Sequence, residues 1–345
     1  MLPLTLIGPL FRPRRGDQPS GRPILFMTLL AELDRIGIRY RVVDSNQHNH
    51  LPFVGRPLSA LQVLAHAHHL SAARNISFHG AGPGIATIGG RLLRHVRTNQ
   101  SRVSLHVFGG AFRRHYDVSN TYQKSRIERV LAKAHAVFFE TQGQVDFFKR
   151  LNANTFWFPN SRPRVLTGDA PSRNYGRRFV FVGHVSPEKG VREIIALAER
   201  LGAGYEVDVF GPTNGGIPVS EFAGKRATYR GVLAPDQVAA TIAGYDALLL
   251  PTSYAGEGFP GVVIEAMSVG VPSIASRHAG IPEIIVDGQC GFLVAPRSTD
   301  DLLSAVKRLE HHELAAIRRQ CLDRFRLFDS TEQTKLFLKR IGVAM

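Results

Sequence analysis

The sequence of 345 residues has few cysteines, few acidic residues in its first half and no long apolar run. Its two cysteines, Cys290 and Cys321, exclude a disulfide framework and a metal site built from four thiolates. Apolar runs such as Ala136–Phe139 have the length of strands and fall far short of the roughly 18 residues of a membrane-spanning helix. The segment Met1–Leu10 lacks the basic start of a signal peptide, so we expect a reduced, cytoplasmic protein.

Apolar residues are nevertheless plentiful. Hydrophobic residues make up 44% of the chain and charged residues 21%, values that are typical of soluble globular proteins. This composition excludes a chain that is mainly disordered, because enough apolar surface exists to bury sizeable cores. At roughly 150 residues per domain, the length predicts about two domains.

Basic residues outnumber acidic ones by 43 to 28, and the excess is concentrated in the first half. Residues 1–160 carry 21 Lys and Arg against 8 Asp and Glu, whereas residues 161–345 carry 22 against 20. This asymmetry indicates an anionic partner, either a membrane surface or a nucleic acid. The alternative is an arginine-rich surface that contacts only water.

Short β-type runs alternate with amphipathic stretches of helical length along the whole chain. We expect strands at Leu4–Ile7, Arg39–Val43, Ile76–Phe78, Val103–Val107, Ala136–Phe139, Phe179–Val182, Tyr205–Phe210, Ala247–Leu250, Pro272–Ala275 and Gly291–Val294. We expect helices at Ile24–Ile36, Ser59–Asn75, Thr121–Ala134, Val191–Leu201, Pro235–Ala243, Gly261–Val269, Asp300–Leu309 and Thr331–Ile341. The alternation predicts an α/β fold of two doubly wound, Rossmann-like domains.

A segment rich in proline and glycine, with little periodicity, divides the two halves. The predicted organisation is an N-terminal domain over residues 1–158, a linker over 159–178, a second domain over 179–328 and a C-terminal helix over 329–345. We expect this helix to fold back toward the N-terminal domain and to brace a cleft between the domains.

The first chemically suggestive turn follows the expected strand Phe179–Val182 and reads GHVSPEKG. Gly183 lets the backbone come close to a ligand, and Lys189 places a positive charge just before a helix whose N-terminus attracts anions. This arrangement suits a diphosphate. The alternative is a turn glycine followed by a solvated lysine.

A second loop follows the expected strand Ala247–Leu250 and carries Glu257 before a helix and Glu265 about one turn inside it. Glu265 lies among apolar residues and needs a partner, which is either the hydroxyls of a ribose or a buried cation. A third turn, Gly231–Leu233, has a backbone suited to the edge of a flat base, although alone it is a weak signal.

The segments FVGHVSPEKG, EGFPGVVIEAMSVGVPSIAS and AGIPEIIVDGQCGFLV, in this order, resemble the retaining glycosyltransferases of family 4, which have the GT-B fold. The resemblance covers Phe179 to about Leu309 and extends more loosely over the first half. It implies an enzyme of polysaccharide or glycolipid biosynthesis that transfers a sugar, expected to be a hexose. The nucleotide-sugar donor would bind the C-terminal domain, and a glycan or lipid-linked acceptor would bind the N-terminal domain.

By this resemblance, Lys189 neutralises the diphosphate as its bond to the sugar breaks, Glu257 orients the donor sugar and Glu265 holds the ribose. The other residues that would contact the donor are Gly183, His184, Gly231, Val232, Leu233, Gly258, Phe259, Pro260, Gly261, Val262 and Val263.

The sequence departs from the family pattern at two places. His184 stands where the family often has arginine, so the leaving group would depend more heavily on Lys189. The turn after the first strand has Gly16 and Gly21 in place of a paired glycine loop. The acceptor-side histidine of the family is either His79 or His106, which both lie at the ends of expected strands, and a structural role is the alternative for each.

Asp-x-Asp, which would bridge a divalent metal to the diphosphate, occurs nowhere in the sequence. We therefore expect catalysis without a metal or another cofactor. Lys189 and the helix N-termini would stabilise the leaving diphosphate instead.

Two other functions compete with sugar transfer. An epimerase or phosphorylase of the same fold would need an active-site acid set or a pyridoxal-binding lysine, for which no recognisable context exists. A nucleic-acid-binding module is disfavoured because aromatics are not interleaved with the basic residues. Arg91, Arg94 and Arg97, spaced three apart on an expected helix, instead indicate peripheral binding to an anionic inner membrane face.

Overall fold

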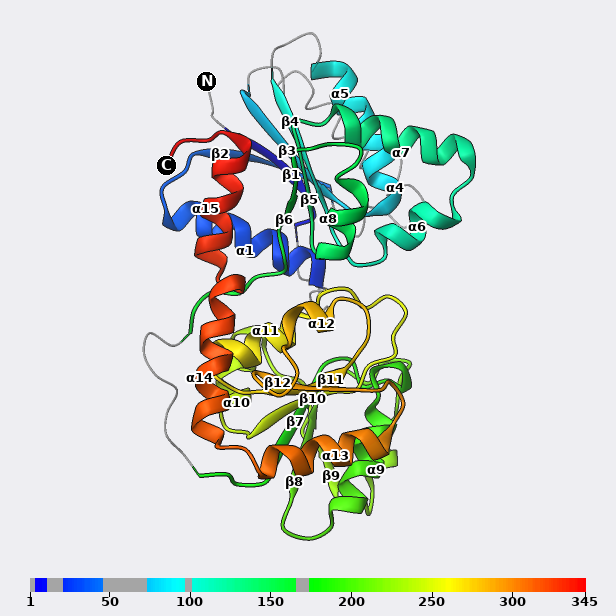
Figure 1. The fold of residues 1–345 in the computed structure, drawn as a ribbon, viewed down its shortest axis with the longest axis vertical. Coiled ribbons are helices and arrows are strands. Elements are labelled where there is room, and N and C mark those ends of the chain that lie inside the picture. Colours follow the sequence, from blue (N-terminus) through cyan, green and yellow to red (C-terminus); the bar gives the residue numbers. More distant parts are fainter. Residues whose placement is uncertain (1–3, 11–20, 46–72, 97–100, 166–173) are drawn as a thin grey trace. The chain divides into compact units, whose positions relative to one another are not determined.

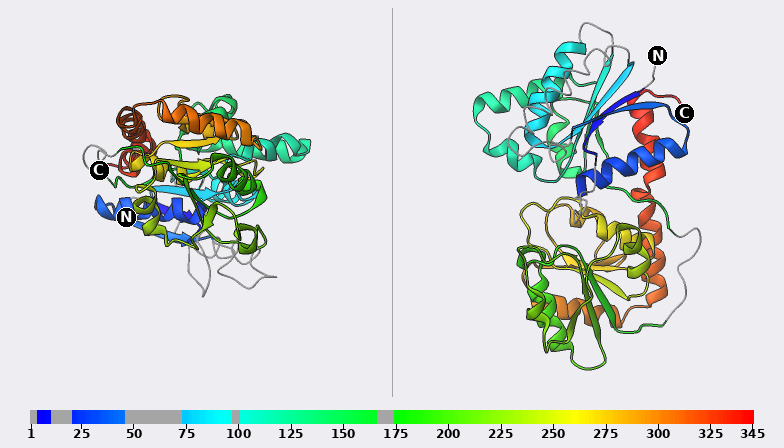
Figure 2. Two further views of the ribbon diagram at one scale, coloured as in Figure 1. Left: turned by 90° about the horizontal axis from the view of Figure 1, so that it is seen from below. Right: turned by 180° about the vertical axis from the view of Figure 1, so that it is seen from behind.

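The computed structural model describes residues 4–10, 21–45, 73–96, 101–165 and 174–345. The chain divides into two compact units, drawn in Figures 1 and 2. Unit 1 comprises Met1–Ser161 together with Ser330–Met345, and unit 2 comprises Arg162–Asp329. The chain therefore passes from one unit to the other twice, after Ser161 and after Asp329.

Unit 1 contains a six-stranded parallel sheet with the strand order β2-β1-β3-β4-β5-β6. Its strands are β1 Leu4–Gly8, β2 Tyr40–Asp44, β3 Asn75–Gly80, β4 Arg102–Val107, β5 Ala136–Phe139 and β6 Thr155–Trp157. The central strands are buried along almost their whole length, as expected of a parallel sheet with helices on both faces.

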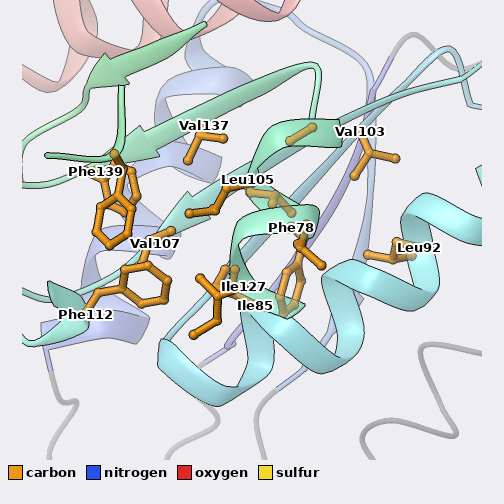
Figure 3. Close-up of a cluster of buried hydrophobic side chains, with 14 of the residues drawn as sticks. Phe78, Ile85, Leu92, Val103, Leu105, Val107, Phe112, Ile127, Val137 and Phe139 are labelled. Atoms are coloured by element: carbon orange, nitrogen blue, oxygen red, sulfur yellow. The ribbon is translucent and has the colours of Figure 1, made fainter. Parts of the chain in front are cut away.

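Alternate residues of the strands enter two separate cores, because successive side chains of a strand point to opposite faces. On one face, Val137 and Phe139 of β5 lie in a cluster with Leu92 and Ile127 of two covering helices, shown in Figure 3. On the other face, the intervening Phe138 belongs to a second cluster.

The helices that cover the first of these faces are α4 Gly82–Gly84, α5 Gly90–Val96, α6 Phe112–Val118, α7 Thr121–Lys133 and α8 Gln142–Phe148, with a π-helical turn at Ile85–Gly89. Helix α7 begins at a capping box in which the Asn120 side chain accepts from the Gln123 amide and the Gln123 side chain accepts from the Asn120 amide. Figure 1 shows α4, α5 and α7 together on this side of the sheet.

The second face is covered by α1 Gly21–Arg35 and α15 Ser330–Ile341, which lie side by side in Figures 1 and 2. Phe337 and Leu338 of α15 are fully buried against the sheet, and each such side chain stabilises the unit by about 1.5–3 kcal/mol. The hydroxyl of Ser330 donates to Oε1 of Glu32 at 2.6 Å and so ties the start of α15 to α1.

Unit 2 contains a second six-stranded parallel sheet, of order β12-β11-β10-β7-β8-β9. Its strands are β7 Arg178–Val182, β8 Glu206–Phe210, β9 Ala227–Tyr229, β10 Ala247–Leu250, β11 Ser273–Ser276 and β12 Gly291–Val294. Connections after β7 run toward β8, whereas connections after β10 run toward β11. The neighbouring strands β7 and β10 therefore form a topological switch point, where open α/β sheets bind ligands beyond the strand ends.

In the described residues of unit 2, the helices that accompany this sheet are α9 Val191–Leu201, α10 Val238–Ile242, α11 Gly261–Ser268, α12 Ile281–Ile284, α13 Thr299–Glu310 and α14 Leu314–Phe325. Short 3₁₀ turns lie at Pro187–Lys189, Val219–Phe222, Pro235–Gln237 and Arg326–Phe328. Helix α9 contacts α13, and α11 contacts α10 and α14.

All ten expected strands are present, with ends that shift by at most two residues, and most expected helices are confirmed. The expected helix Ser59–Asn75 is wrong at its end, because Asn75 begins β3; its residues 59–72 lie outside the described residues. The expected helix Pro235–Ala243 is a 3₁₀ turn followed by α10, since Pro235 starts the turn. The sequence analysis missed α14, although Leu314, Ile317 and Cys321 are buried at helical spacing.

Within the described part of the chain, no helix combines the length and the apolar character needed to cross a membrane.

Candidate active site

The two loops singled out from the sequence flank the switch point of unit 2, one after β7 and the other after β10. Their contact depends on Gly190, which has φ +79° at the end of the first loop. A Cβ at Gly190 would lie 2.3 Å from the carbonyl oxygen of Pro251, so only glycine allows this approach. The amide of Ser253 also donates to the carbonyl oxygen of Glu188 at 2.7 Å. The structure thus brings both predicted loops together.

Lys189 and Glu257, the two predicted catalytic residues, form an ion pair across these loops. Nζ of Lys189 lies 2.7 Å from Oε2 of Glu257, and the lysine and glutamate side chains are 22% and 8% exposed. The ammonium group also lies 5.0 Å from the ring centroid of Tyr254. An ammonium has three donors, so this pair leaves others available for the oxygens of an anion.

The segment that carries Glu257 is shaped by its own loop. The Glu257 amide donates to the carbonyl oxygen of Tyr254 at 2.9 Å, and a Cβ at Gly256 would lie 2.7 Å from the Tyr254 ring. The carbonyl oxygen of Gly258 accepts from the amide of Gly280 at 3.0 Å. Phe259 is buried against Phe328, which anchors the loop just before α11.

Helix α11 begins directly after this loop. Pro260 is its N-cap, Gly261 is its first residue, and Val262 and Val263 follow in its first turn. The Pro260 side chain does not cap this end, so, apart from the Val263 amide, which donates to the carbonyl oxygen of Pro260 at 3.2 Å, the first-turn N–H groups receive no cap from their N-cap residue. Such amides can donate to a ligand placed beyond β10.

Glu265 of α11 is paired with an arginine that the sequence analysis did not select. Nε of Arg162 lies 2.5 Å from Oε1 of Glu265, and the two side chains are 10% and 21% exposed. Sequence reasoning left a ribose and a buried cation open as partners of Glu265. The structure shows the cation, which comes from 103 residues away in the chain.

The turns after β7, β8 and β9 are joined by backbone hydrogen bonds. The amide of Gly183 donates to Phe210, and the amide of Gly211 donates to Gly231 at 2.8 Å. A Cβ at Gly211 would lie 1.7 Å from the carbonyl oxygen of Gly183. Gly211 therefore connects two predicted donor turns, and the FGP sequence, which begins with the last residue of β8, is the signal that could have identified it.

The outer residues of these turns are exposed to different degrees. Val232 is exposed, and Leu233 is half-buried beside it. His184 is exposed as well, and its Nε2 lies 3.0 Å from the carbonyl oxygen of Asn214. His184 thus points toward the loop after β8.

His79 and His106, the two acceptor-side candidates, lie in the core of unit 1. They sit opposite each other in register on β3 and β4, their Nδ1 atoms are 3.0 Å apart, and both are fully buried. Burial lowers the pKa of His79 to about 3 and lowers that of His106 well below its usual value. The aromatic rings of Phe108 and Phe337 surround the pair, which gives both histidines a packing role.

The two acceptor-side glycines are placed less fully. Gly21 is the first residue of α1. Gly16 lies outside the described residues.

In the ranges that the structure describes, no group of three or more His, Cys, Asp or Glu side chains is arranged to hold a metal ion.

The sequence of unit 2 resembles those of known proteins. Residues 176–312 match the family model described as glycosyl transferases group 1, a segment that contains both loops. Over 185 residues, or 51% of this chain, the sequence is 31% identical to glycogen synthase of Mycobacterium tuberculosis. Over 140 residues, or 38% of this chain, it is 29% identical to the sulfoquinovosyl transferase SQD2 of Arabidopsis thaliana.

These alignments span only 42% of the glycogen synthase and 26% of SQD2. The chain therefore matches less than half the length of these curated relatives.

Solved structures extend the likeness to both units. The structure of Anabaena Alr3699/HepE in complex with UDP aligns with a TM-score of 0.72 and 16% identity over 99% of this chain and 100% of its own. Sucrose-phosphate synthase of Thermosynechococcus elongatus aligns with a TM-score of 0.68 and 16% identity over 98% of both chains. The chain thus has the GT-B fold, and its residues 176–312 carry the sequence pattern of glycosyl transferases group 1.

Proposed function

We propose that this protein is a retaining glycosyltransferase of family 4 that transfers a hexose from a nucleotide sugar to a glycan or lipid-linked acceptor. The observation that carries the proposal is the Lys189–Glu257 pair, held at the switch point beside the start of α11. Names of similar proteins support it, since they include a glycogen synthase, a sulfoquinovosyl transferase and a protein solved with UDP.

The chemistry follows from where charge develops. When the bond between the anomeric carbon and the phosphate oxygen breaks, its electron pair stays on the nucleoside diphosphate and positive charge grows on the sugar. Lys189 and the amides at the start of α11 stabilise that negative charge in place, without first having to reorganise. Glu257, already fixed by Lys189, orients the donor sugar.

The nucleoside would lie on the other side of the same site. Glu265 accepts a hydroxyl of the ribose, and the turn Gly231–Leu233 contacts the base. Since these groups come from α11 and from the turn after β9, the donor would extend across the carboxyl ends of the strands.

We assign no metal to this reaction. Lys189 supplies the positive charge that a divalent cation would otherwise bring to the diphosphate. The described residues offer no cluster of metal ligands at the site, and Asp-x-Asp does not occur in the sequence.

An anionic membrane surface is the partner proposed for unit 1. Unit 1 carries 24 Lys and Arg against 9 Asp and Glu, whereas unit 2 carries 19 of each. Arg91 and Arg94 are exposed on α5, and Arg113 and Arg114 are exposed on α6. Val118 and Tyr122, where α6 meets α7, are 77% and 67% exposed. Cations beside exposed apolar side chains are typical of proteins that rest on an anionic leaflet.

The test of the proposed function is a thermal-shift panel of UDP, GDP, ADP and their sugar conjugates, followed by a donor-hydrolysis assay. A ligand at about 100 times its Kd adds about 2.7 kcal/mol of stability. We expect one base to stabilise the protein and its sugar conjugate to be cleaved slowly. A protein that is shifted by none of these nucleotides would refute the proposal.

A further inference from the structure

We infer that Arg162 is a positioning and specificity-determining residue, which holds the carboxylate of Glu265 so that its second oxygen accepts a ribose hydroxyl. The inference rests on the proposed function, because it takes the ligand of Glu265 to be a nucleotide. It adds a residue from outside the matched segment 176–312 to the donor site.

Arg162 contacts one oxygen of the Glu265 carboxylate. Nε of Arg162 donates to Oε1 of Glu265 at 2.5 Å. Among the described residues, no donor contacts Oε2 of this carboxylate, and the side chain of Glu265 keeps 21% of its surface exposed. A carboxylate with one oxygen held by a guanidinium and the other open to solvent is an oriented acceptor for a single hydroxyl.

Gly261 leaves room for the guanidinium of Arg162. A Cβ at Gly261 would lie 1.7 Å from a terminal nitrogen of Arg162 and 2.5 Å from its guanidinium carbon. Glycine is a poor helix former, yet it begins α11 at this point. Any other residue at position 261 would displace the guanidinium of Arg162 from Glu265. This steric requirement explains why a glycine stands there.

The charge of Arg162 also depends on Glu265. The guanidinium lies beside the first residue of α11, at the positive end of the helix dipole, which is unfavourable for a cation. The Glu265 carboxylate offsets this repulsion. The two oppositely charged side chains are both largely buried, so each restricts the position of the other.

The backbone of Arg162 is itself anchored within unit 2. Its amide donates to the carbonyl oxygen of Phe328 at 3.0 Å, and its backbone pairs with Asp329. Arg162 is thus fixed by contacts that are independent of α11, so it can serve as a rigid support for Glu265.

The experiment measures Kd for whichever of UDP, GDP or ADP gives the largest thermal shift, and for the 2′-deoxy and 3′-deoxy forms of that nucleotide. We expect the wild type to prefer the ribonucleotide over at least one deoxy form by about tenfold. Arg162→Gln should reduce this preference to less than twofold while changing the Kd of that deoxy form little. Arg162→Lys should retain part of the preference, because it keeps a cation near Glu265.

Two further variants separate positioning from a general structural effect. Gly261→Ala, whose Cβ displaces the guanidinium, should lose the preference as Arg162→Gln does. Arg164→Gln is the matched control, since it removes an arginine of the same segment that bonds Asp329 and does not touch Glu265. It should leave the preference unchanged.

Failure of the proposed function and failure of the role inferred for Arg162 give different results. A wild type that binds none of the nucleotides overturns the proposed function. If the wild type binds but Arg162→Gln weakens both forms equally, or neither, Arg162 does not position Glu265. If Arg162→Gln fails to fold, Gly261→Ala and Arg162→Lys test the inference instead. The quantity compared is again the ratio of the Kd of the deoxy form to that of the ribonucleotide.

Discussion

Nζ of Lys189 lies 2.7 Å from Oε2 of Glu257, although the two residues are 68 positions apart in the chain. Gly190 makes this contact possible, because its lack of a side chain lets the loop after β7 rest on Pro251 at the end of β10. The two residues that the sequence singled out for separate tasks therefore form one charged unit.

Lys189→Ala should lower turnover by roughly 10²–10³-fold, since removal of one preorganised donor to a developing charge has effects of this size. It also leaves the buried Glu257 carboxylate without its cation, so thermal stability should fall. The double variant Lys189→Ala/Glu257→Gln should recover stability but not turnover. Lys225→Ala, which removes an exposed lysine of the same unit, is the control. Unchanged turnover in Lys189→Ala would refute the catalytic role.

The two glutamates should differ in which step they affect. Glu265→Gln should weaken nucleotide binding about tenfold, because it weakens a charge-assisted hydrogen bond to the ribose. Glu257→Gln should leave the Kd of the nucleotide within about twofold and lower the rate of sugar transfer. Isothermal titration with the nucleoside diphosphate, paired with donor turnover, measures both. Normal nucleotide binding by both variants would show that the ribose assignment is wrong.

Activity should survive removal of divalent metals. In the proposed function Lys189 supplies the positive charge beside the diphosphate, so dialysis against EDTA should change turnover less than twofold. The measurement is donor turnover before and after chelation, with magnesium and manganese added back. Complete loss that either metal restores would contradict this prediction.

Binding to vesicles should require anionic lipid and should weaken with salt. Each exposed arginine near the leaflet contributes about 1 kcal/mol, so Arg91→Gln/Arg94→Gln should reduce co-sedimentation roughly 30-fold at low salt. Arg97, which belongs to the same predicted triplet, lies outside the described residues. Lys339→Gln/Arg340→Gln removes the same charge from α15 on the opposite face of the sheet and should have little effect. Equal losses in the two variants would mean that net charge, and not this face, binds lipid.

The buried histidine pair predicts how stability changes with pH. Burial lowers the pKa of His79 to about 3, whereas an unfolded chain protonates histidine near 6.5. The unfolded state therefore binds more protons below pH 6.5, and stability should fall by about 1.4 kcal/mol per pH unit for each such histidine as pH drops toward 5. His106→Phe should flatten this slope, because it removes one of the two buried histidines. Identical slopes in the wild type and His106→Phe would contradict this account.

Most of the fold was predictable from the sequence because hydrophobic periodicity is a local property. Strands such as Ala136–Phe139 and helices such as Val191–Leu201 have the bounds expected from their patterns. The sequence also placed the loops after β7 and after β10 at strand ends, where the structure has them, since turn residues next to strand ends follow from that same pattern. Helix α14 was missed because charged residues are interspersed among its buried positions.

The partners of these residues were decided only by the tertiary structure. His79 and His106 were expected at strand ends near an acceptor, but the pleat directs both toward the face that α1 and α15 cover, and α15 comes from the far end of the chain. Glu265 was expected to need a partner, and Arg162 supplies it from a segment with no periodic pattern of its own. The sequence by itself determined which residues carry charge and where the strands end. The long-range contacts determined which of those charges meet, because chain crossings and close glycine approaches have no local signature in the sequence.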